Sequence, residues 1–271
     1  MSIVWFNGKF EAGMLPLDPA DRGFLLGDGV FETVAVLNGR AIWLHAHLAR
    51  MENAAVELGI AFDKAALLSG AAAVLQKSES ASEVLRLTLS RGRTGRGLSG
   101  DGHSPSLLIT LNEFARPAIA QPCHLKVSSI RRNEFAPSSR MKTLSYIDGI
   151  AAAREIEGQA DEALMLNTAG HVASATVANI FLIVGQELIT PSLDQGILPG
   201  ITRKVWLETA SQLALKPVER IVILEELFRV DTVFLCNSLR PLRPVGQLNE
   251  TTLKMRSLDE LGSVFMKGLK Q

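Results

Sequence analysis

The chain has 271 residues, of which 47% are hydrophobic and 21% are charged, a composition typical of a globular protein with a buried core and not of a disordered chain. Basic and acidic residues balance at 28 each, so the net charge gives no reason to expect a nucleic acid or an anionic membrane as partner. No apolar run approaches the roughly 18 residues of a membrane span, the N-terminus lacks a signal-peptide pattern, and two cysteines are too few for a disulfide framework, which together fit a cytoplasmic protein.

The first expected elements are a β-hairpin and a helix. Residues 30–37 form an apolar strand, Asn38-Gly39 is a preferred two-residue turn, and residues 41–44 are expected to return as the second strand. Apolar residues then recur at spacings of three and four, at Leu44, Leu48, Met51, Ala55 and Leu58. This period predicts an amphipathic helix that ends at Gly59.

The remaining elements predict a mixed α/β (α+β) fold in two domains. Helices are expected at about 63–76, 146–157 and 201–213 and from Asp259, strands at 83–90, 106–112, 124–130, 162–167, 217–223 and 232–236, and a hairpin at about 179–190. Pro117 and Pro122 lie among small residues and favour an interdomain linker. We therefore expect a smaller N-terminal domain at 1–115, a linker at 116–122 and a larger C-terminal domain at 123–271 that carries Lys142.

A turn that contains Pro199 and Gly200 comes directly before the expected helix at 201–213. Free amide groups and the positive end of the helix dipole at such a helix start suit a phosphate. The alternative is an ordinary helix start that happens to follow Pro and Gly.

Lys142 and Arg50 are candidate ligands whose local patterns are ambiguous. A lone lysine between a polar loop and a helix is usually a solvated charge. Arg50, expected near the end of the first helix, fits either a phosphate fork or a cap of the last helical turn. His45 and His47 are two residues apart, so on a helix their side chains diverge, and we expect no metal there.

Two glycine-containing segments have different readings. Gly27-Asp28-Gly29 precedes a strand and lacks a third glycine, which argues against a dinucleotide site. The segment 91–97 contains Arg91, Arg93 and Arg96 between glycines. It fits either a solvated turn or a mobile basic loop that binds a carboxylated substrate.

Taken in order, these motifs resemble the fold-type IV family of pyridoxal 5'-phosphate (PLP) enzymes, which includes D-amino-acid and branched-chain aminotransferases and 4-amino-4-deoxychorismate lyase. The resemblance spans nearly the whole chain. The motifs that carry it are Asp21-Arg22-Gly23, Gly27-Asp28-Gly29, His47-Leu48-Ala49-Arg50, Lys142, Asp161-Glu162-Ala163-Leu164, Asn179-Ile180-Phe181, Gly200-Ile201-Thr202-Arg203 and Cys236-Asn237-Ser238-Leu239.

The resemblance implies a role for each matching residue. Lys142 would form the Schiff base with PLP and later move protons. The phosphate would be held by Arg50, the main-chain amides of Ile201 and Thr202, and the Ser238 hydroxyl. The family architecture implies two α/β domains with the cofactor between them, as in D-amino-acid aminotransferase, and a homodimer.

The chain departs from the family pattern at Ser174. The family places a glutamate five residues before the Asn of Asn179-Ile180-Phe181, where it pairs with the protonated pyridine nitrogen. Ser174 occupies that position, so the charge-assisted hydrogen bond is missing unless another carboxylate replaces it. We hypothesise that the weaker electron withdrawal penalises transamination more than elimination.

Three functions remain open from the sequence. The stretches at 90–97, 193–196 and 236–245 look most like 4-amino-4-deoxychorismate lyase, which releases pyruvate to make 4-aminobenzoate for folate synthesis. Arg93, Arg96 and Arg240 are then candidates for binding a dicarboxylated substrate, or are exposed residues without that role. The alternatives are an aminotransferase of D-amino or branched-chain amino acids, and a non-catalytic PLP-binding protein.

Overall fold

The computed structural model describes residues 2–95, 97–99, 104–115, 121–256 and 261–263. The chain forms two compact units. Unit 1 comprises Met1–Arg116 and Met141–Tyr146, and unit 2 comprises Pro117–Arg140 and Ile147–Gln271. Much of the expected linker 116–122, and Asp259 as the start of the last helix, lie outside the described residues.

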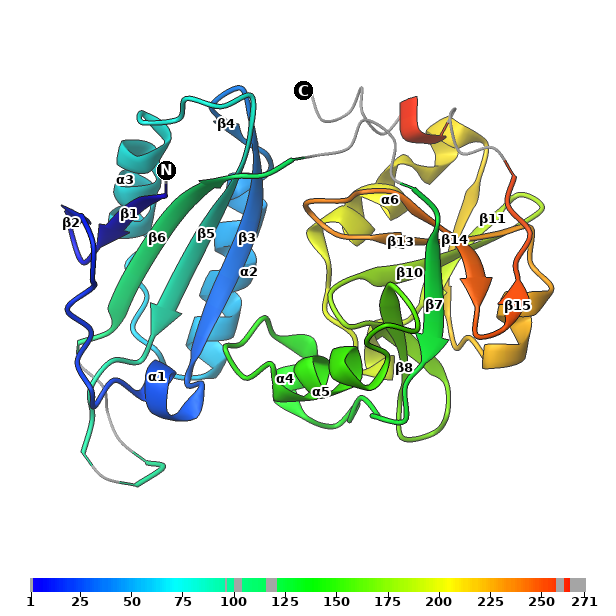
Figure 1. Ribbon diagram of the computed structural model, residues 1–271, viewed down its shortest axis with the longest axis horizontal. Coiled ribbons are helices and arrows are strands. Elements are labelled where there is room, and N and C mark those ends of the chain that lie inside the picture. Colours follow the sequence, from blue (N-terminus) through cyan, green and yellow to red (C-terminus); the bar gives the residue numbers. More distant parts are fainter. Residues whose placement is uncertain (1, 96, 100–103, 116–120, 257–260, 264–271) are drawn as a thin grey trace. The chain divides into compact units, whose positions relative to one another are not determined.

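Unit 1 is a sheet with two helices on one face (Figure 1). Its strands are β1 (Ile3–Phe6), β2 (Lys9–Glu11), β3 (Gly29–Leu37), β4 (Arg40–Ala41), β5 (Ser82–Ser90) and β6 (Ser106–Glu113), in the order β2-β1-β6-β5-β3-β4. Its helices are α1 (Arg22–Leu26), α2 (Leu44–Glu57) and α3 (Lys64–Leu75). The apolar faces of α2 and α3 bury Leu48 and Leu67 against Val34, Leu85 and Ile109 of the sheet.

The prediction that residues 41–44 form the second strand of the hairpin is wrong. β4 is only two residues long, and Trp43 adopts a left-handed conformation with φ 54° directly before α2. The chain therefore turns into the helix where we expected a strand. The periodic helix prediction agrees with α2, whereas α1 had no apolar period to reveal it.

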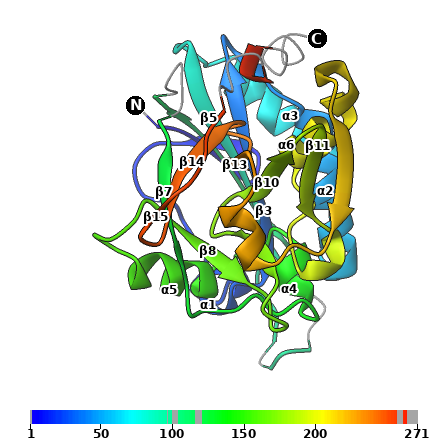
Figure 2. The same ribbon diagram turned by 90° about the vertical axis from the view of Figure 1, so that its right-hand side faces the viewer.

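Unit 2 contains a second sheet, whose strands can be followed in Figure 2. The described strands are β7 (Cys123–Val127), β8 (Glu162–Leu166), β9 (Val172–Ala175), β10 (Asn179–Val184), β11 (Glu187–Pro191), β12 (Lys216–Arg220), β13 (Thr232–Cys236), β14 (Arg243–Leu248) and β15 (Thr251–Thr252). Their order is β12-β11-β10-β13-β14-β7-β8-β9, with β15 beside β14. The helices are α4 (Pro137–Arg140), α5 (Ile147–Glu155), α6 (Ile201–Thr209), and the 3-10 turns η1 (Leu193–Gln195), η2 (Ala210–Leu213) and η3 (Leu224–Phe228). This mixed, two-sheet architecture confirms the expected fold class.

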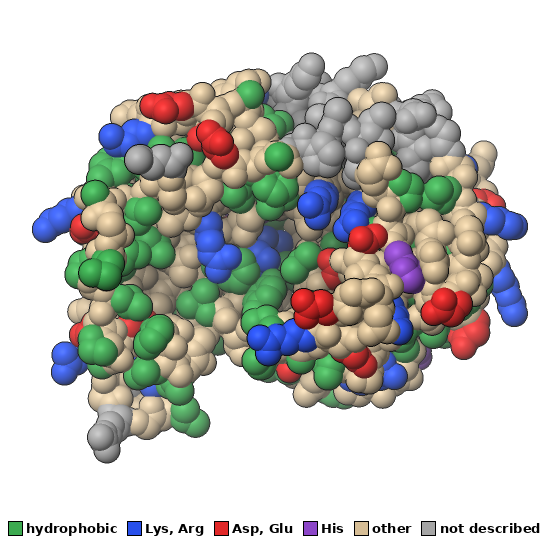
Figure 3. Space-filling view, in the orientation of Figure 1, with side chains coloured by type: hydrophobic (Ala, Val, Ile, Leu, Met, Phe, Trp, Pro, Cys, Tyr) green, Lys and Arg blue, Asp and Glu red, His purple; other side chains and the backbone are tan. Residues whose placement is uncertain are grey.

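Side chains of both charges are visible on the face that Figure 3 shows. On the visible face of each unit, basic and acidic side chains are interspersed, in keeping with the zero net charge (Figure 3). Within the described part of the chain, every helix is too short or too polar to cross a bilayer.

Candidate active site

The segment that carries Lys142 is paired with β3. The Phe31 amide donates to the Lys142 carbonyl at 2.9 Å, and the Leu144 amide donates to the Gly29 carbonyl at 2.9 Å. A Cβ at Gly29 would lie 2.6 Å from the Leu89 carbonyl oxygen of β5 and 2.6 Å from the Leu144 side chain, so this position requires glycine. The sequence analysis assigns Lys142 to the C-terminal domain. That assignment is wrong, because these backbone hydrogen bonds join its segment to unit 1.

The Lys142 amine lies in an aromatic environment. Its Nζ donates to the Tyr146 hydroxyl at 3.0 Å and lies 4.4 Å from the centre of the Phe31 ring. The Phe31 and Tyr146 rings contact edge to face, with centres 5.3 Å apart. Phe31, Lys142 and Tyr146 thus hold a half-buried amine against two rings, with one oxygen atom as its acceptor.

Arg50 is held by a buried carboxylate. Its Nε and Nη2 atoms donate to Glu32 at 2.8 and 2.6 Å, and His47 Nδ1 contacts the same carboxylate at 2.6 Å. Burial alone would raise the pKa of Glu32, but the His47 hydrogen bond and the Arg50 cation outweigh it and lower the pKa to about 2. Arg50 also lies in the middle of α2, so the interpretation as a cap of the last turn is wrong.

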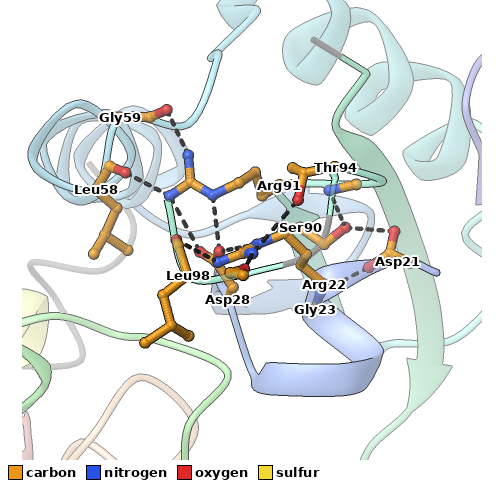
Figure 4. A network of polar contacts seen from close by, with 12 residues as sticks. Asp21, Arg22, Gly23, Asp28, Leu58, Gly59, Ser90, Arg91, Thr94 and Leu98 are labelled. Carbon is orange, nitrogen blue, oxygen red and sulfur yellow. Dashed lines mark hydrogen bonds and ion pairs between the residues drawn. The ribbon is translucent and has the colours of Figure 1, made fainter. Parts of the chain in front are cut away.

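The first part of the basic loop is anchored by Asp28 (Figure 4). Asp28 accepts hydrogen bonds from Arg22 at 2.7 Å and from Arg91 at 2.8 Å. Burial alone would raise the pKa of this carboxyl, but the hydrogen bonds and positive charges of Arg91 and Arg22 outweigh burial and lower it. The Arg22 guanidinium also donates hydrogen bonds to the Gly97 and Leu98 carbonyls. It therefore holds the C-terminal end of the loop as well.

The three arginines of this loop differ in their surroundings. Arg93 is 71% exposed and lies 3.4 Å from Asp18 in an ion pair. Arg96 lies outside the described residues. Arg91 donates to the Leu58 and Gly59 carbonyls as well as to Asp28. Its guanidinium therefore stabilises the fold of unit 1.

In unit 2, the start of α6 has the features of an anion site. Gly200 is its N-cap and supplies no side-chain cap. The Thr202 hydroxyl is buried and has no hydrogen-bond partner among the described residues. A Cβ at Gly200 would lie 2.1 Å from Asn179 Oδ1, while the Asn179 amide donates to the Leu198 carbonyl at 3.0 Å. An unsatisfied buried hydroxyl beside free helix-end amides fits a phosphate oxygen.

The other candidates in unit 2 lie at strand ends. Ser174 is buried in β9, and its hydroxyl donates to the Ala175 carbonyl at 2.9 Å. Ser238 follows β13 in a turn in which Asn237 accepts from the Arg240 amide at 2.8 Å.

Arg240 lines a small pocket with Glu162, Val177, Ala178, Leu235, Asn237 and Arg243. Burial raises the pKa of Glu162, although the Thr176 hydroxyl donates to its carboxylate. In the sequence, Glu162 stands out only as part of the motif Asp161-Glu162-Ala163-Leu164.

The structure therefore divides the candidate residues into two sets. Unit 1 brings Lys142 together with Phe31 and Tyr146, and it also holds Arg50. Unit 2 contains the other predicted ligands, namely Ser174, Ile201, Thr202, Ser238 and Arg240. Each set is described within its own unit: a half-buried amine beside two aromatic rings in unit 1, and a helix start that suits a phosphate in unit 2.

A family comparison decides the classification. Residues 29–248 match the model of the family described as amino-transferase class IV. The chain belongs to this family. Class IV enzymes depend on PLP, so this protein is a PLP-dependent enzyme, either a lyase or an aminotransferase.

Three proteins to which this chain is similar illustrate the range. Aminodeoxychorismate lyase of Bacillus subtilis is 30% identical, over 94% of this chain and 89% of its own length. The structure of 4-amino-4-deoxychorismate lyase from Pseudomonas aeruginosa is 28% identical, with a TM-score of 0.81 over 99% of this chain and 98% of that one. The PLP-bound form of a hypothetical aminotransferase from Mycobacterium tuberculosis, at 23% identity, shares the fold with a TM-score of 0.87 over 98% of both chains.

Proposed function

We propose that this protein is a 4-amino-4-deoxychorismate lyase. The observation that carries the proposal is its likeness to the Bacillus subtilis lyase along nearly the whole chain. The neutral Ser174 side chain adds support, because a hydroxyl cannot supply the negative charge with which the family glutamate favours transamination.

The proposed ligands follow the family pattern. Arg50, the amides of Ile201 and Thr202, and the Ser238 hydroxyl bind the PLP phosphate, and Lys142 binds its aldehyde carbon. To these we add the Thr202 hydroxyl, which has no partner among the described residues. Glu32 orients Arg50 through two hydrogen bonds.

The reaction needs one proton to be moved. When bound, PLP withdraws electrons from the carbon that bears the substrate amine. Lys142 takes the proton from that carbon, and the electron pair left behind forms a ring double bond as the neighbouring carbon–oxygen bond breaks. The enolpyruvate that departs receives a proton from Lys142, so the products are pyruvate and 4-aminobenzoate. Tyr146 accepts a hydrogen bond from the amine and positions it.

The experiment is to add 4-amino-4-deoxychorismate to the PLP-loaded protein and to measure both products. D-alanine and L-leucine, each with 2-oxoglutarate, are tested in parallel. We expect pyruvate and 4-aminobenzoate in equal amounts, and no product from Lys142→Ala. Lys9→Ala, at an exposed position, serves as the control for loss of a lysine.

The other outcomes select other functions. Conversion of an amino acid to its 2-oxo acid identifies an aminotransferase, which the family description supports as the second candidate. PLP absorption without turnover of any substrate identifies a non-catalytic PLP-binding protein. We further propose that the lyase acts as a cytoplasmic homodimer in folate synthesis, and sedimentation of the holoenzyme tests the dimer.

A further inference from the structure

The turn before α6 contains a glycine whose backbone does not require one. Gly200 has φ −66° and ψ 136°, a conformation that any residue adopts. A side chain is excluded for a different reason, because a Cβ at this position would overlap Asn179 Oδ1. The Arg203 Cβ, in contrast, would be 3.3 Å away. The Asn179 side chain therefore takes up the space that a side chain at position 200 would need.

Asn179 holds this turn with a buried amide group. It is the first residue of β10 and is 7% exposed. Its Nδ2 atom donates to the Leu198 carbonyl at 3.0 Å, while Oδ1 lies against Gly200. One side chain thus contacts the backbone on both sides of Pro199. These contacts fix the path of the chain into α6.

Asn179 also lies beside the segment that leads to Ser238. In the antiparallel pair of β10 and β13, Asn179 is opposite Cys236, and Ser238 follows two residues later in the turn after β13. Helix α6 is tied to the same turn, because the Trp206 indole donates to the Pro241 carbonyl at 2.8 Å. The two segments that carry the proposed phosphate ligands of unit 2 therefore meet near Asn179.

The groups that the turn orients are those of the proposed phosphate site. The first amides of a helix have no partner within it, and in α6 these include the amides of Ile201 and Thr202. The Thr202 hydroxyl is also buried without a partner among the described residues. Hydrogen bonds weaken steeply as their angles depart from linearity. An anion that several such groups bind therefore depends on how the helix start is oriented.

We propose that Asn179 is a positioning residue of the phosphate site, which holds residues 198–200 so that the amides of Ile201 and Thr202 point at the PLP phosphate. The inference rests on the proposed function, because it takes the start of α6 as the site of that phosphate. Asn179 is neutral and donates to the Leu198 carbonyl, so it acts on the phosphate through the turn. Its loss should weaken binding of the phosphate group and leave binding of the rest of the cofactor unchanged.

The first test compares PLP with pyridoxal, which has the same ring and aldehyde but no phosphate. Absorbance titration of the PLP-free protein measures the affinity for each compound. Asn179→Ala is expected to lower the affinity for PLP about tenfold and that for pyridoxal less than about twofold. A variant that only destabilises the protein would lower both affinities by the same factor. Circular dichroism verifies folding, and Asn179→Leu, similar in size but without the donor, is used if Asn179→Ala does not fold.

Asn249→Ala is the matched control in unit 2. The Asn249 side chain accepts a hydrogen bond from the Val127 amide at 3.0 Å, and its φ is 50°. Alanine loses this bond and is strained in the left-handed conformation, so the control should melt at a lower temperature than the wild type. The ratio of its affinities for PLP and pyridoxal should equal that of the wild type.

The second test uses the close approach of Asn179 and Gly200. Gly200→Ala places a methyl group against Asn179 Oδ1 and should lower the affinity for PLP about tenfold. In the Asn179→Ala background the same substitution finds room, so the further loss should be less than about threefold. If the double variant instead loses the full product of the two single effects, the two residues do not act through their contact and the assignment is overturned.

The outcomes distinguish the two proposals. If the wild type cleaves no substrate but Asn179→Ala weakens the binding of PLP alone, the lyase proposal fails and the assignment of Asn179 stands. If the wild type cleaves 4-amino-4-deoxychorismate, and Asn179→Ala leaves the affinity for PLP unchanged or lowers both affinities equally, the assignment of Asn179 is overturned and the lyase proposal stands.

Discussion

Glu32 receives two hydrogen bonds from Arg50, at 2.8 and 2.6 Å, and its carboxylate is fully buried between strand and helix. Glu32→Gln leaves the Arg50 cation without its negative partner, so we expect the free energy of unfolding to fall by about 3 kcal/mol at neutral pH. Urea denaturation measures the change. Glu52→Gln breaks the exposed ion pair with Lys64 and should cost less than about 1 kcal/mol. If the free energy of unfolding falls equally in both variants, the buried Glu32–Arg50 pair contributes no more to stability than the exposed pair.

The same carboxylate predicts a pH dependence. The pKa of Glu32 is lowered from 4.5 to about 2 in the folded protein, so ionised Glu32 stabilises the fold fully above pH 4.5. That contribution is lost as the pH falls towards 2. The stability gap between wild type and Glu32→Gln should therefore narrow through this window, as urea midpoints at a series of pH values will show. If the difference in stability widens as the pH falls, the pKa of Glu32 is not lowered in the folded protein.

Tyr146→Phe removes the acceptor of the Lys142 amine while keeping the ring. We expect kcat to fall about tenfold, since a proton-transferring group loses its orientation, and KM to change little. The pH–rate profile should shift as well, which a purely structural substitution would not cause. Because Tyr146 is the only tyrosine in the sequence, loss of the phenolate absorption band verifies the variant directly. An unchanged profile and kcat would exclude a positioning role.

Thr202→Val is expected to act in opposite directions on stability and on cofactor binding. The Thr202 hydroxyl is buried without a partner among the described residues, so an isosteric apolar side chain should leave the PLP-free protein as stable or about 1 kcal/mol more stable. The affinity for PLP should fall about tenfold, as measured by equilibrium dialysis. Thr202→Ser is the control that retains the hydroxyl. If valine lowers stability and leaves the PLP affinity intact, the hydroxyl does not bind the phosphate.

Asp28→Asn should loosen the loop that Arg22 holds. With the carboxylate gone, Arg22 loses the ion pair that directs it to the Gly97 carbonyl, and trypsin should cut after the exposed Arg93 about tenfold faster. Mass spectrometry of the fragments identifies the bond. Trypsin should cut the control variant Asp148→Asn, which is changed at an exposed position in α5, at the wild-type rate. No change on Asp28→Asn would mean that the remaining contacts suffice.

Local patterns in the sequence predicted the parts of the fold that depend on near neighbours. The apolar period located α2, and Asn38-Gly39 located the β3–β4 turn. The Lys142 segment was assigned to the wrong domain because its hydrogen bonds to β3 are non-local and leave no periodic pattern.

The pairing of Lys142 with β3 also affects how the protein is made. Unit 1 draws its last segment, Met141–Tyr146, from beyond the start of unit 2. During synthesis, the N-terminal sheet must wait until more than half of the chain has left the ribosome before it receives the strand-like segment that carries the lysine. A truncated product that ends before Met141 would then contain the helices and sheet of unit 1 but no reactive amine, so partial chains cannot assemble a working lysine site prematurely.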